Sequence, residues 1–312
     1  MAMMKGKILK LLKNEATVIS GEALSTRLGF SRVSIWKHIQ GLKGMGYKID
    51  ATAKGYRLVK SPDIPFAWEF PGREDRIHYY ERAPSTMGIA REMARQGCPE
   101  MTVVVAGIQT KGRGRMNRLW RSGRGGLYFT LVLRPAVAPV NGVRVNLYAA
   151  TVLARTLKEV FDIDAGVKWP NDILVDEKKV SGLLSEMEAE FDRVTYLNIG
   201  IGINVNNDPT HDEPGATTLK HLLGRSISRI DLLTSFLDAF EANLATAVSN
   251  QVIDQWKQST VTLNRPVKVV TPRAVTEGVA VDVDENGGLM IRQKDGSIKT
   301  VMYGDCFHGD DG

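Results

Sequence analysis

The sequence has little cysteine and no long apolar run. Only Cys98 and Cys306 occur among 312 residues. Two cysteines so far apart form no metal-ligand pattern, and they make a disulfide framework improbable. No stretch reaches the roughly 18 consecutive apolar residues of a membrane span, and the first residues lack the apolar region and cleavage site of a secretory signal. We therefore expect a cytoplasmic protein with no membrane partner.

The composition is that of an ordinary globular chain. Hydrophobic residues make up 43% of the sequence, and the length allows two or three domains. The formal net charge of +6 is a modest excess. Such an excess is compatible with a nucleic-acid or other anionic partner and proves neither.

Residues 5–60 predict three helices in a small domain. Ser20 and Ser31 are suitable N-caps for the second and third helices, and Gly29 is a suitable terminator between them. In the third helix, we expect one buried face and one polar face. The expected buried residues are Val33, Trp36, Ile39 and Leu42, and the expected polar residues are Arg32, Ser34, Lys37 and His38.

The residues after the third helix alternate as in a short hairpin, with its turn at Lys54 and Gly55. A helix-turn-helix followed by a hairpin is a winged helix, whose third helix enters the major groove of DNA. The alternative is a winged helix that contacts protein, or one that has lost DNA binding. The candidate DNA-binding residues are Arg32, Ser34 and Lys37 on the helix, and Lys54 and Arg57 on the wing.

Three prolines between residues 61 and 72 indicate a semi-rigid linker. Beyond residue 77, longer helices and strands alternate, and Pro170 interrupts one strand. This pattern predicts an α+β domain built on a mixed sheet. The expected organisation is a winged helix over 1–62, a linker over 63–76, a central domain over 77–263 and a small β domain over 264–312.

One loop of the central domain is strongly basic. The segment "KGRGRMNRLWRSGRGG", residues 111–126, holds six cationic side chains and no acid, and it joins two expected strands. Its glycines allow close approach of the backbone to a ligand, and its arginines suit a phosphate or carboxylate. A nucleic-acid patch and a solvated loop remain alternatives. Because the run is of one sign, we expect it to need a counter-ion, and we favour a cradle for a small anion.

Three further stretches join this loop as candidates for the site. "VKWPND" places Asn171 and Asp172 at the strand break, and "KKVSG" places Lys179 at the start of the next strand. "NIGIGINVN" combines glycines with Asn204, which suits close backbone approach to a ligand. A simple turn and solubilising hairpin lysines are the alternative interpretations of the first two stretches.

Four motifs in this order, "GRGRMNRLW", "VKWPNDILV", "KKVSGLL" and "IGIGINVN", resemble those of the biotin protein ligases. The N-terminal winged helix resembles that of the bifunctional ligase/repressor subgroup, and residues 264–307 look like the family's small SH3-like β-barrel. The resemblance covers residues 5–307. It implies that the central mixed-sheet domain is related to class II synthetases.

The resemblance implies a two-step reaction. The biotin carboxylate attacks the α-phosphate of ATP, with Mg²⁺, to give biotinyl-5′-AMP and pyrophosphate. A lysine of a biotin carboxyl carrier protein then takes the biotinyl group, and AMP is released. In the repressor subgroup, biotinyl-5′-AMP would also act as corepressor and promote a homodimer that binds operator DNA. No metal-ligand set is assigned.

The resemblance also implies roles for individual residues. The implied catalytic residues are Arg113, Lys179 and Asp172, of which Asp172 either deprotonates the carrier lysine or holds a cation. The implied biotin-binding residues are Ser85, Thr86, Met87, Gln109, Arg113, Gly114, Arg115 and Lys179. The implied nucleotide-binding residues are Arg115, Trp120, Asn171 and Asn204.

One position departs from the family's pattern. Met87 stands where the family usually has asparagine after Ser-Thr, and a thioether cannot replace an amide as donor and acceptor.

Two other functions remain open. One is a lipoate-ligase-like enzyme, against which the GRGR and KWPND stretches argue. The other is a biotin-sensing regulator without catalysis, against which Arg113, Asp172 and Lys179 argue.

Overall fold

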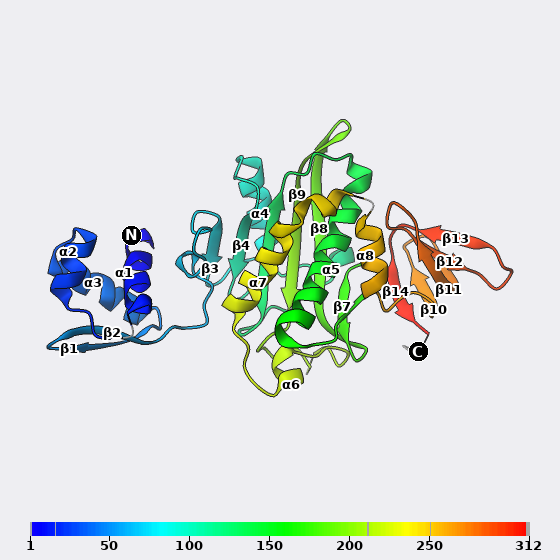
Figure 1. Ribbon diagram of the computed structural model, residues 1–312. Coiled ribbons are helices and arrows are strands. Elements are labelled where there is room, and N and C mark those ends of the chain that lie inside the picture. Colours follow the sequence, from blue (N-terminus) through cyan, green and yellow to red (C-terminus); the bar gives the residue numbers. More distant parts are fainter. Residues whose placement is uncertain (1, 16, 211, 250, 310–312) are drawn as a thin grey trace. The chain divides into compact units, whose positions relative to one another are not determined.

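The computed structural model describes residues 2–15, 17–210, 212–249 and 251–309, and it divides into two compact units, Met1–Asp75 and Arg76–Gly312 (Figure 1). The first unit contains helices α1 (Ala2–Asn14), α2 (Gly21–Leu28) and α3 (Arg32–Gly44). They are followed by the antiparallel hairpin of β1 (Lys48–Thr52) and β2 (Gly55–Lys60). The winged helix predicted from the sequence is confirmed.

Local sequence signals set the ends of α2 and α3. The Ser20 hydroxyl accepts a hydrogen bond from Ala23 N at 3.0 Å, and the Ser31 hydroxyl accepts one from Ser34 N at 3.2 Å. Gly29 ends α2 with φ of +72°, a conformation that favours glycine. Both predicted caps and the predicted terminator are confirmed.

The expected division of α3 into faces is wrong in its first half. Val33 and Trp36 are 64% and 52% exposed, and the buried stripe is Ile35, Ile39 and Leu42. At about 100° per residue, positions three apart drift around a helix by about 60° at each step. The series Val33, Trp36, Ile39, Leu42 therefore starts on the exposed side and reaches the buried side only at Ile39, whereas the i, i+4, i+7 spacing of Ile35, Ile39 and Leu42 stays on the buried side.

The proline-containing segment after the wing packs against the first unit. Phe66 and Trp68 pack against its core, the latter within the short 3₁₀ helix η1 (Ala67–Glu69). Trp68 Nε1 donates to the Tyr47 hydroxyl at 2.8 Å, and that hydroxyl donates to the buried Glu69. Part of the expected linker thus completes the core of the winged-helix unit.

The second unit is built on a seven-stranded mixed sheet, as predicted. Its strands lie in the order β3-β4-β5-β9-β8-β7-β6, and only the β3–β4 pair is parallel. Pro170 lies between β6 and β7, where the interruption was expected. The strands are β3 (Ile77–Tyr80), β4 (Thr102–Ala106), β5 (Leu127–Leu133), β6 (Gly166–Lys168), β7 (Asp172–Val175), β8 (Lys178–Glu190) and β9 (Arg193–Ile203).

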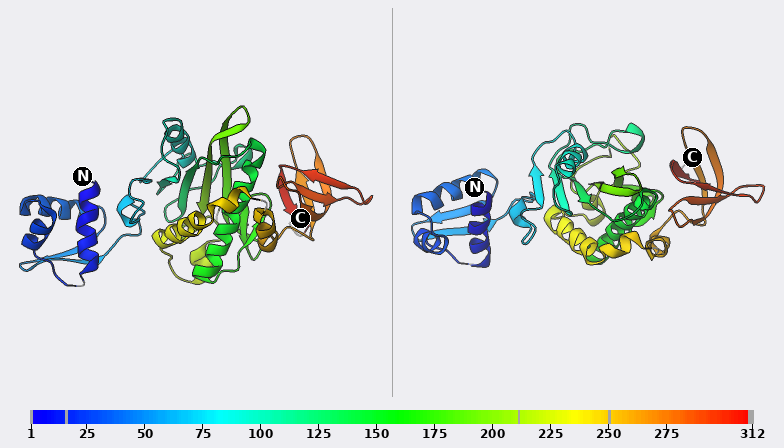
Figure 2. Two further views of the ribbon diagram at one scale, coloured as in Figure 1. Left: turned by 45° about the horizontal axis from the view of Figure 1, so that its top comes forward. Right: turned by 90° about the horizontal axis from the view of Figure 1, so that it is seen from above.

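Helices cover both faces of this sheet. In Figure 2, right, α4 (Thr86–Arg95) lies on one face, and α5 (Gly142–Phe161) and α7 (Arg229–Ala242) lie on the other. Buried aromatic rings join the sheet to α7, with Phe129 and Phe236 centroids 5.5 Å apart. The remaining helical segments are η2 (Arg115–Asn117), η3 (Pro139–Asn141), α6 (Leu219–Leu223), η4 (Leu244–Val248) and α8 (Gln251–Ser259).

The chain ends in an antiparallel five-stranded sheet within the second unit, which confirms a small C-terminal β domain. The order is β13-β12-β11-β10-β14. The strands are β10 (Pro266–Val270), β11 (Val275–Val283), β12 (Leu289–Arg292), β13 (Ile298–Val301) and β14 (Asp305–His308). Buried Trp169 attaches this sheet to the central one, because its Nε1 donates to Gly287 O at 3.0 Å. Across the described ranges, no helix is both long and apolar enough to span a bilayer.

Candidate active site

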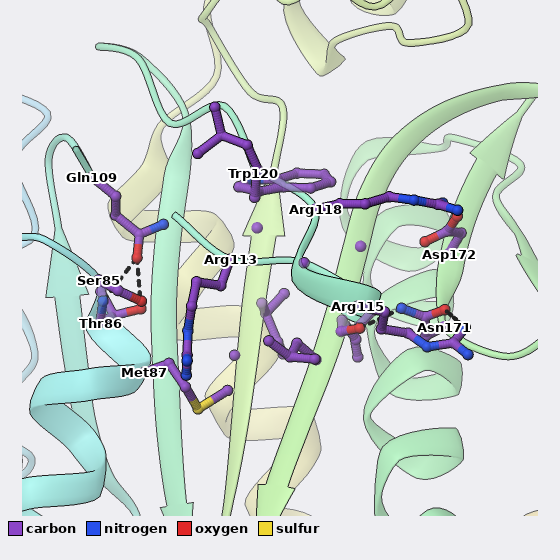
Figure 3. A pocket seen from close by; sticks show the side chains of 18 of the residues that line it. Ser85, Thr86, Met87, Gln109, Arg113, Arg115, Arg118, Trp120, Asn171 and Asp172 are labelled. Carbon is purple, nitrogen blue, oxygen red and sulfur yellow. Dashed lines mark hydrogen bonds between the residues drawn. The ribbon is translucent and has the colours of Figure 1, made fainter. Parts of the chain in front are cut away.

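A cavity of about 270 Å³ lies between the start of α4, the basic loop, and strands β7, β8 and β9 (Figure 3). It brings together segments up to about a hundred residues apart in the central domain, together with Asp305 of the C-terminal sheet. All but one of the predicted ligase residues line it. They are Ser85, Thr86, Met87, Gln109, Arg113, Gly114, Arg115, Trp120, Asn171, Asp172 and Lys179.

One end of the cavity, called the neutral end below, is rich in uncharged hydrogen-bonding groups, and Arg113 lies beside its Met87 (Figure 3). Gln109 Oε1 accepts from both the backbone N and the hydroxyl of Thr86, at 2.8 and 3.1 Å. Gln109 Nε2 donates to Ser122 Oγ at 2.9 Å, and Thr130 Oγ1 donates to Thr86 Oγ1 at 2.8 Å. These bonds fix the Gln109 amide and the Thr86 hydroxyl in defined orientations, as a polar uncharged ligand requires.

The two neighbours of Thr86 differ in character. Ser85 occupies the N-cap position of α4, but its side chain makes no capping hydrogen bond. Its hydroxyl therefore stays available to a ligand. Met87 is 3% exposed, and its Cε would lie 2.9 Å from a Cβ built on Gly200. The departure from asparagine thus gives this wall an apolar side chain packed over a glycine.

Glycines of β8 and β9 make the floor on which Trp120 lies. A Cβ built on Gly202 would be 2.3 Å from Trp120 Nε1, and one built on Gly182 would be 3.0 Å from Trp120 Cζ3. The Trp120 Nε1 donor is buried and has no hydrogen-bond partner among the residues that the structure describes. Lys179 Nζ lies 5.2 Å from the centroid of the indole, within the range of a cation–π contact.

The opposite end of the cavity carries charge. Lys179 Nζ lies 2.8 Å from Asp172 Oδ1, and both side chains are about one-third exposed. Arg115 donates to Asn171 Oδ1 and to the Gly304 carbonyl, each at 2.9 Å. Burial lowers the pKa of Arg115 below its ordinary value, and the carboxylates of the site partly oppose that shift. The guanidinium remains a cation because arginine is not deprotonated in proteins.

The arginines of the basic loop have partners within the chain. Arg115 uses neutral acceptors, and the other four arginines pair with carboxylates from distant segments. These pairs are Arg113–Glu186, Arg118–Asp305, Arg121–Asp212 and Arg124–Glu81. The expected unpaired run of charge is therefore neutralised internally. An anionic ligand has to exchange with these carboxylates, which are partly or largely exposed in most pairs.

Asn204 is the one predicted ligase residue outside the cavity. Its side chain is 2% exposed, and its Oδ1 accepts from Asn207 Nδ2 at 3.0 Å. Its backbone N and O bond to Val180 and Leu219. These contacts join the end of β9 to the following segment, so in this structure Asn204 supports the floor from outside.

Several residues of the cavity were not anticipated from the sequence. Thr130 belongs to β5, a strand that reads only as apolar core, and Asp305 comes from the C-terminal sheet. Arg118 stands within the basic loop, and its place in the "GRGRMNRLW" motif was a usable signal. Nothing in the sequence links Asp305 or the Gly304 carbonyl to that loop, because about 190 residues separate them.

The winged-helix unit presents most of its predicted DNA-binding residues to solvent. Arg32, Lys37 and Lys54 are exposed, whereas Ser34 is half-buried on the flank of α3. Arg57 is exposed and pairs with Asp50 on the neighbouring strand at 2.9 Å. Such a surface ion pair is weak, so Arg57 can exchange it for a phosphate.

The positive charge is concentrated in this unit. Residues 1–62 contain twelve lysines and arginines against three acids, a net charge of +9, whereas the whole chain carries +6. The remainder is therefore at −3, and the basic excess belongs to the winged helix alone. A polyanionic partner is consistent with this asymmetry.

The described part of the chain contains no group of three or more histidine, cysteine, aspartate or glutamate side chains suited to a metal ion. Asp172 is one carboxylate close to the charged end. Mg²⁺ commonly binds through one or two carboxylates together with substrate phosphates. The carboxylate of Asp172 fits one ligand of such an ion.

Comparison with known proteins agrees with this architecture. Three family models match: an HTH domain over residues 5–57, the Biotin/lipoate A/B protein ligase family over 79–206, and the Biotin protein ligase C terminal domain over 262–309. The chain is 35% identical to the Bifunctional ligase/repressor BirA of Bacillus subtilis, over 92% of this chain and 93% of that protein.

The Escherichia coli Bifunctional ligase/repressor BirA is 28% identical over 96% of this chain and 95% of its own length. Among solved structures, the biotin protein ligase of Aquifex aeolicus in complex with biotin and ATP superposes with a TM-score of 0.64 at 29% identity. That match covers 75% of this chain and 98% of the other. The chain belongs to the biotin protein ligases, in the bifunctional ligase/repressor group that carries an N-terminal helix-turn-helix domain.

Proposed function

We propose that the cavity binds biotin at its neutral end and ATP at its charged end, forms biotinyl-5′-AMP, and transfers biotin to a lysine of a carrier protein. One observation carries this proposal. A fixed neutral pair, Thr86 and Gln109, and a set of cations that includes Arg115 and Lys179 face one cavity of about 270 Å³. ATP is a cytoplasmic substrate, so the proposed reaction takes place in the cytoplasm.

The neutral end suits the ring system of biotin. A urea group offers a carbonyl acceptor and two N–H donors, which match the hydroxyls of Ser85 and Thr86 and the Gln109 amide. Trp120 and the glycine floor provide apolar contact for the rest of the ring, and Met87 closes that wall. The ligand's carboxylate then points toward Lys179 at the far end.

The charged end supplies what the first step requires. The biotin carboxylate and the ATP α-phosphate are both anions, and their repulsion has to be offset as they approach. Lys179, Arg113 and Arg115 are assigned to this role. Lys179 would break its contact with Asp172 and contact the biotin carboxylate instead. Mg²⁺ bound with the phosphates, close to Asp172 and Asn171, would supply further positive charge.

Asp172 is assigned to the second step. The carrier lysine attacks as a neutral amine, so it must lose a proton to a nearby base. Once Lys179 turns to the ligand, the carboxylate of Asp172 is released from its 2.8 Å contact and can accept that proton. The proton passes from the lysine Nζ to Asp172, and AMP leaves as the new amide forms.

The winged-helix unit is proposed to bind operator DNA, with biotinyl-5′-AMP as corepressor and a homodimer as the bound form. The +9 charge of residues 1–62 supports a DNA partner. Arg32 and Lys37 of α3, with Lys54 and Arg57 of the wing, are assigned to contacts with phosphates or base edges. Ser34 is half-buried beside them and is assigned a supporting contact.

The experiment that tests the ligase is labelling of a purified carrier domain with biotin and ATP. The chain is compared with its Arg113→Ala and Lys179→Ala variants. Removal of one preorganised cation typically costs about 10²–10³ in rate, so both variants are expected to lose most labelling. Biotin binding without any labelling by the unaltered chain would contradict the proposal and favour a non-catalytic sensor. Labelling with lipoate in place of biotin would favour the lipoate-ligase alternative.

A further inference from the structure

The solvent-exposed face of α3 carries two large apolar side chains beside its cations. Val33 is 64% exposed and Trp36 is 52% exposed, and they lie one turn apart on the helix. Arg32 and Lys37 are exposed on the same side. The helix is held in the unit by the opposite stripe, which includes the fully buried Ile35 and Ile39. Val33 and Trp36 therefore contribute little to the core of the winged helix.

These two residues face the wing across a shared hollow. Arg32, Val33 and Trp36 line it from α3, and the hairpin residues from Thr52 to Tyr56, with Lys54 at the turn, line its other side. The start of α2 adds Ser20, Gly21 and one acid, Glu22. The hollow thus has an apolar wall, with two cations and one carboxylate at its edges. Its occupant must combine negative charge at the rim with apolar groups in the centre.

Duplex DNA has this combination in its major groove. Phosphates border the groove, and the C5 methyl of each thymine projects into it as the one apolar group on the base edges. An α-helix about 10–12 Å across fits a groove about 12 Å wide. In helix-turn-helix proteins the first residues of the recognition helix reach the base edges, and Val33 is the second residue of α3. The +9 charge of residues 1–62 favours the polyanion over an ordinary protein surface.

We propose that Val33 and Trp36 read thymine by contact with its C5 methyl group, and that they set the sequence preference of this protein while Arg32 and Lys37 contact phosphates. This inference rests on the proposed DNA-binding function and adds its specificity. It assigns base recognition to side chains that the sequence pattern had placed in the core.

The test removes a single methyl group from the DNA. The full-length chain, with biotin and ATP, first selects duplexes from a pool with a random 24-base-pair centre. In the enriched duplex, each thymine is then replaced in turn by 2′-deoxyuridine, which lacks only the C5 methyl. Binding by the unaltered chain is expected to weaken about fourfold at one or more thymines, the factor for burying one methyl-sized group.

The variants connect that loss to the two side chains. Val33→Ala and Trp36→Ala are each expected to bind thymine and deoxyuridine duplexes equally at one of the sensitive positions. Val18→Ala is the matched control, because Val18 is 39% exposed in the same unit but lies outside α3. It should keep the full discrimination. Thermal unfolding of each variant shows whether the winged helix remains folded.

Two results would overturn the inference. If no thymine replacement changes binding by the unaltered chain, or if both variants keep the fourfold discrimination, Val33 and Trp36 do not read methyl groups, while DNA binding itself stands. If the chain retains no duplex from the pool, even at low salt, the DNA-binding function fails as well. The exposed face of α3 would then be assigned as a binding site for an acidic protein partner.

Discussion

The position of Trp120 depends on the absence of a side chain at Gly202. In Gly202→Ala, the new Cβ would lie 2.3 Å from Trp120 Nε1 and 2.4 Å from Cε2, whereas ordinary contacts begin near 3.4 Å. The indole must therefore withdraw by about 1 Å. Gly202 does not have a positive φ, so alanine is tolerated by the backbone and the effect is a steric one on Trp120.

This displacement has a calculable consequence. A misplacement of about 1 Å in a catalytic site can cost about 10²-fold in rate, and overpacking costs about 1–3 kcal/mol of stability. We expect Gly202→Ala to lose 10- to 100-fold in biotin-dependent pyrophosphate release from ATP while it still unfolds cooperatively. Gly88→Ala is the control, because its Cβ would meet nothing within 4 Å and its helical position favours alanine. Full activity of a folded Gly202→Ala protein would refute the assigned position of Trp120.

Three further predictions address separate parts of the second unit. Thr86→Val removes the hydroxyl that bonds Gln109, and we expect about a tenfold higher KM for biotin with an unchanged KM for ATP; equal effects on both would contradict the neutral end as the biotin site. Asp172→Asn should slow transfer from preformed biotinyl-5′-AMP by about 10²-fold in single-turnover assays, and a normal transfer rate would exclude Asp172 as the base. Phe236→Ala should cost about 3–5 kcal/mol in urea unfolding because the ring is fully buried, and a cost below 1 kcal/mol would contradict its place in the core.

The sequence predicted the fold well where local signals decide it. Ser20, Ser31 and Gly29 mark helix ends through hydrogen bonds and a positive φ that involve only near neighbours. Alternation of apolar residues predicted the hairpin and the main strands. The pattern failed in α3, because spacing by threes alone does not follow one face of a helix, and Ile35 belonged to the buried stripe in place of Val33.

The sequence predicted which residues line the site better than it predicted which carboxylates pair with the arginines of the basic loop. Eleven of the twelve predicted ligase residues line one cavity, because the motifs that carry them lie at the start of α4, in the basic loop and at the first residues of β7 and β8. The partners of the basic loop could not be read from the sequence. Glu186 and Asp305 reach Arg113 and Arg118 across about 70 and 190 residues, and only the folded chain brings them together.

The central claim is that a neutral end selects biotin and a charged end drives its adenylation. The most direct measurement is pyrophosphate release from ATP with biotin, with lipoate and with neither, by the unaltered chain and by Lys179→Ala. We predict release that requires biotin, does not occur with lipoate, and falls about 10²–10³-fold in the variant. Release that is independent of biotin, or unaffected by the loss of Lys179, would contradict the account.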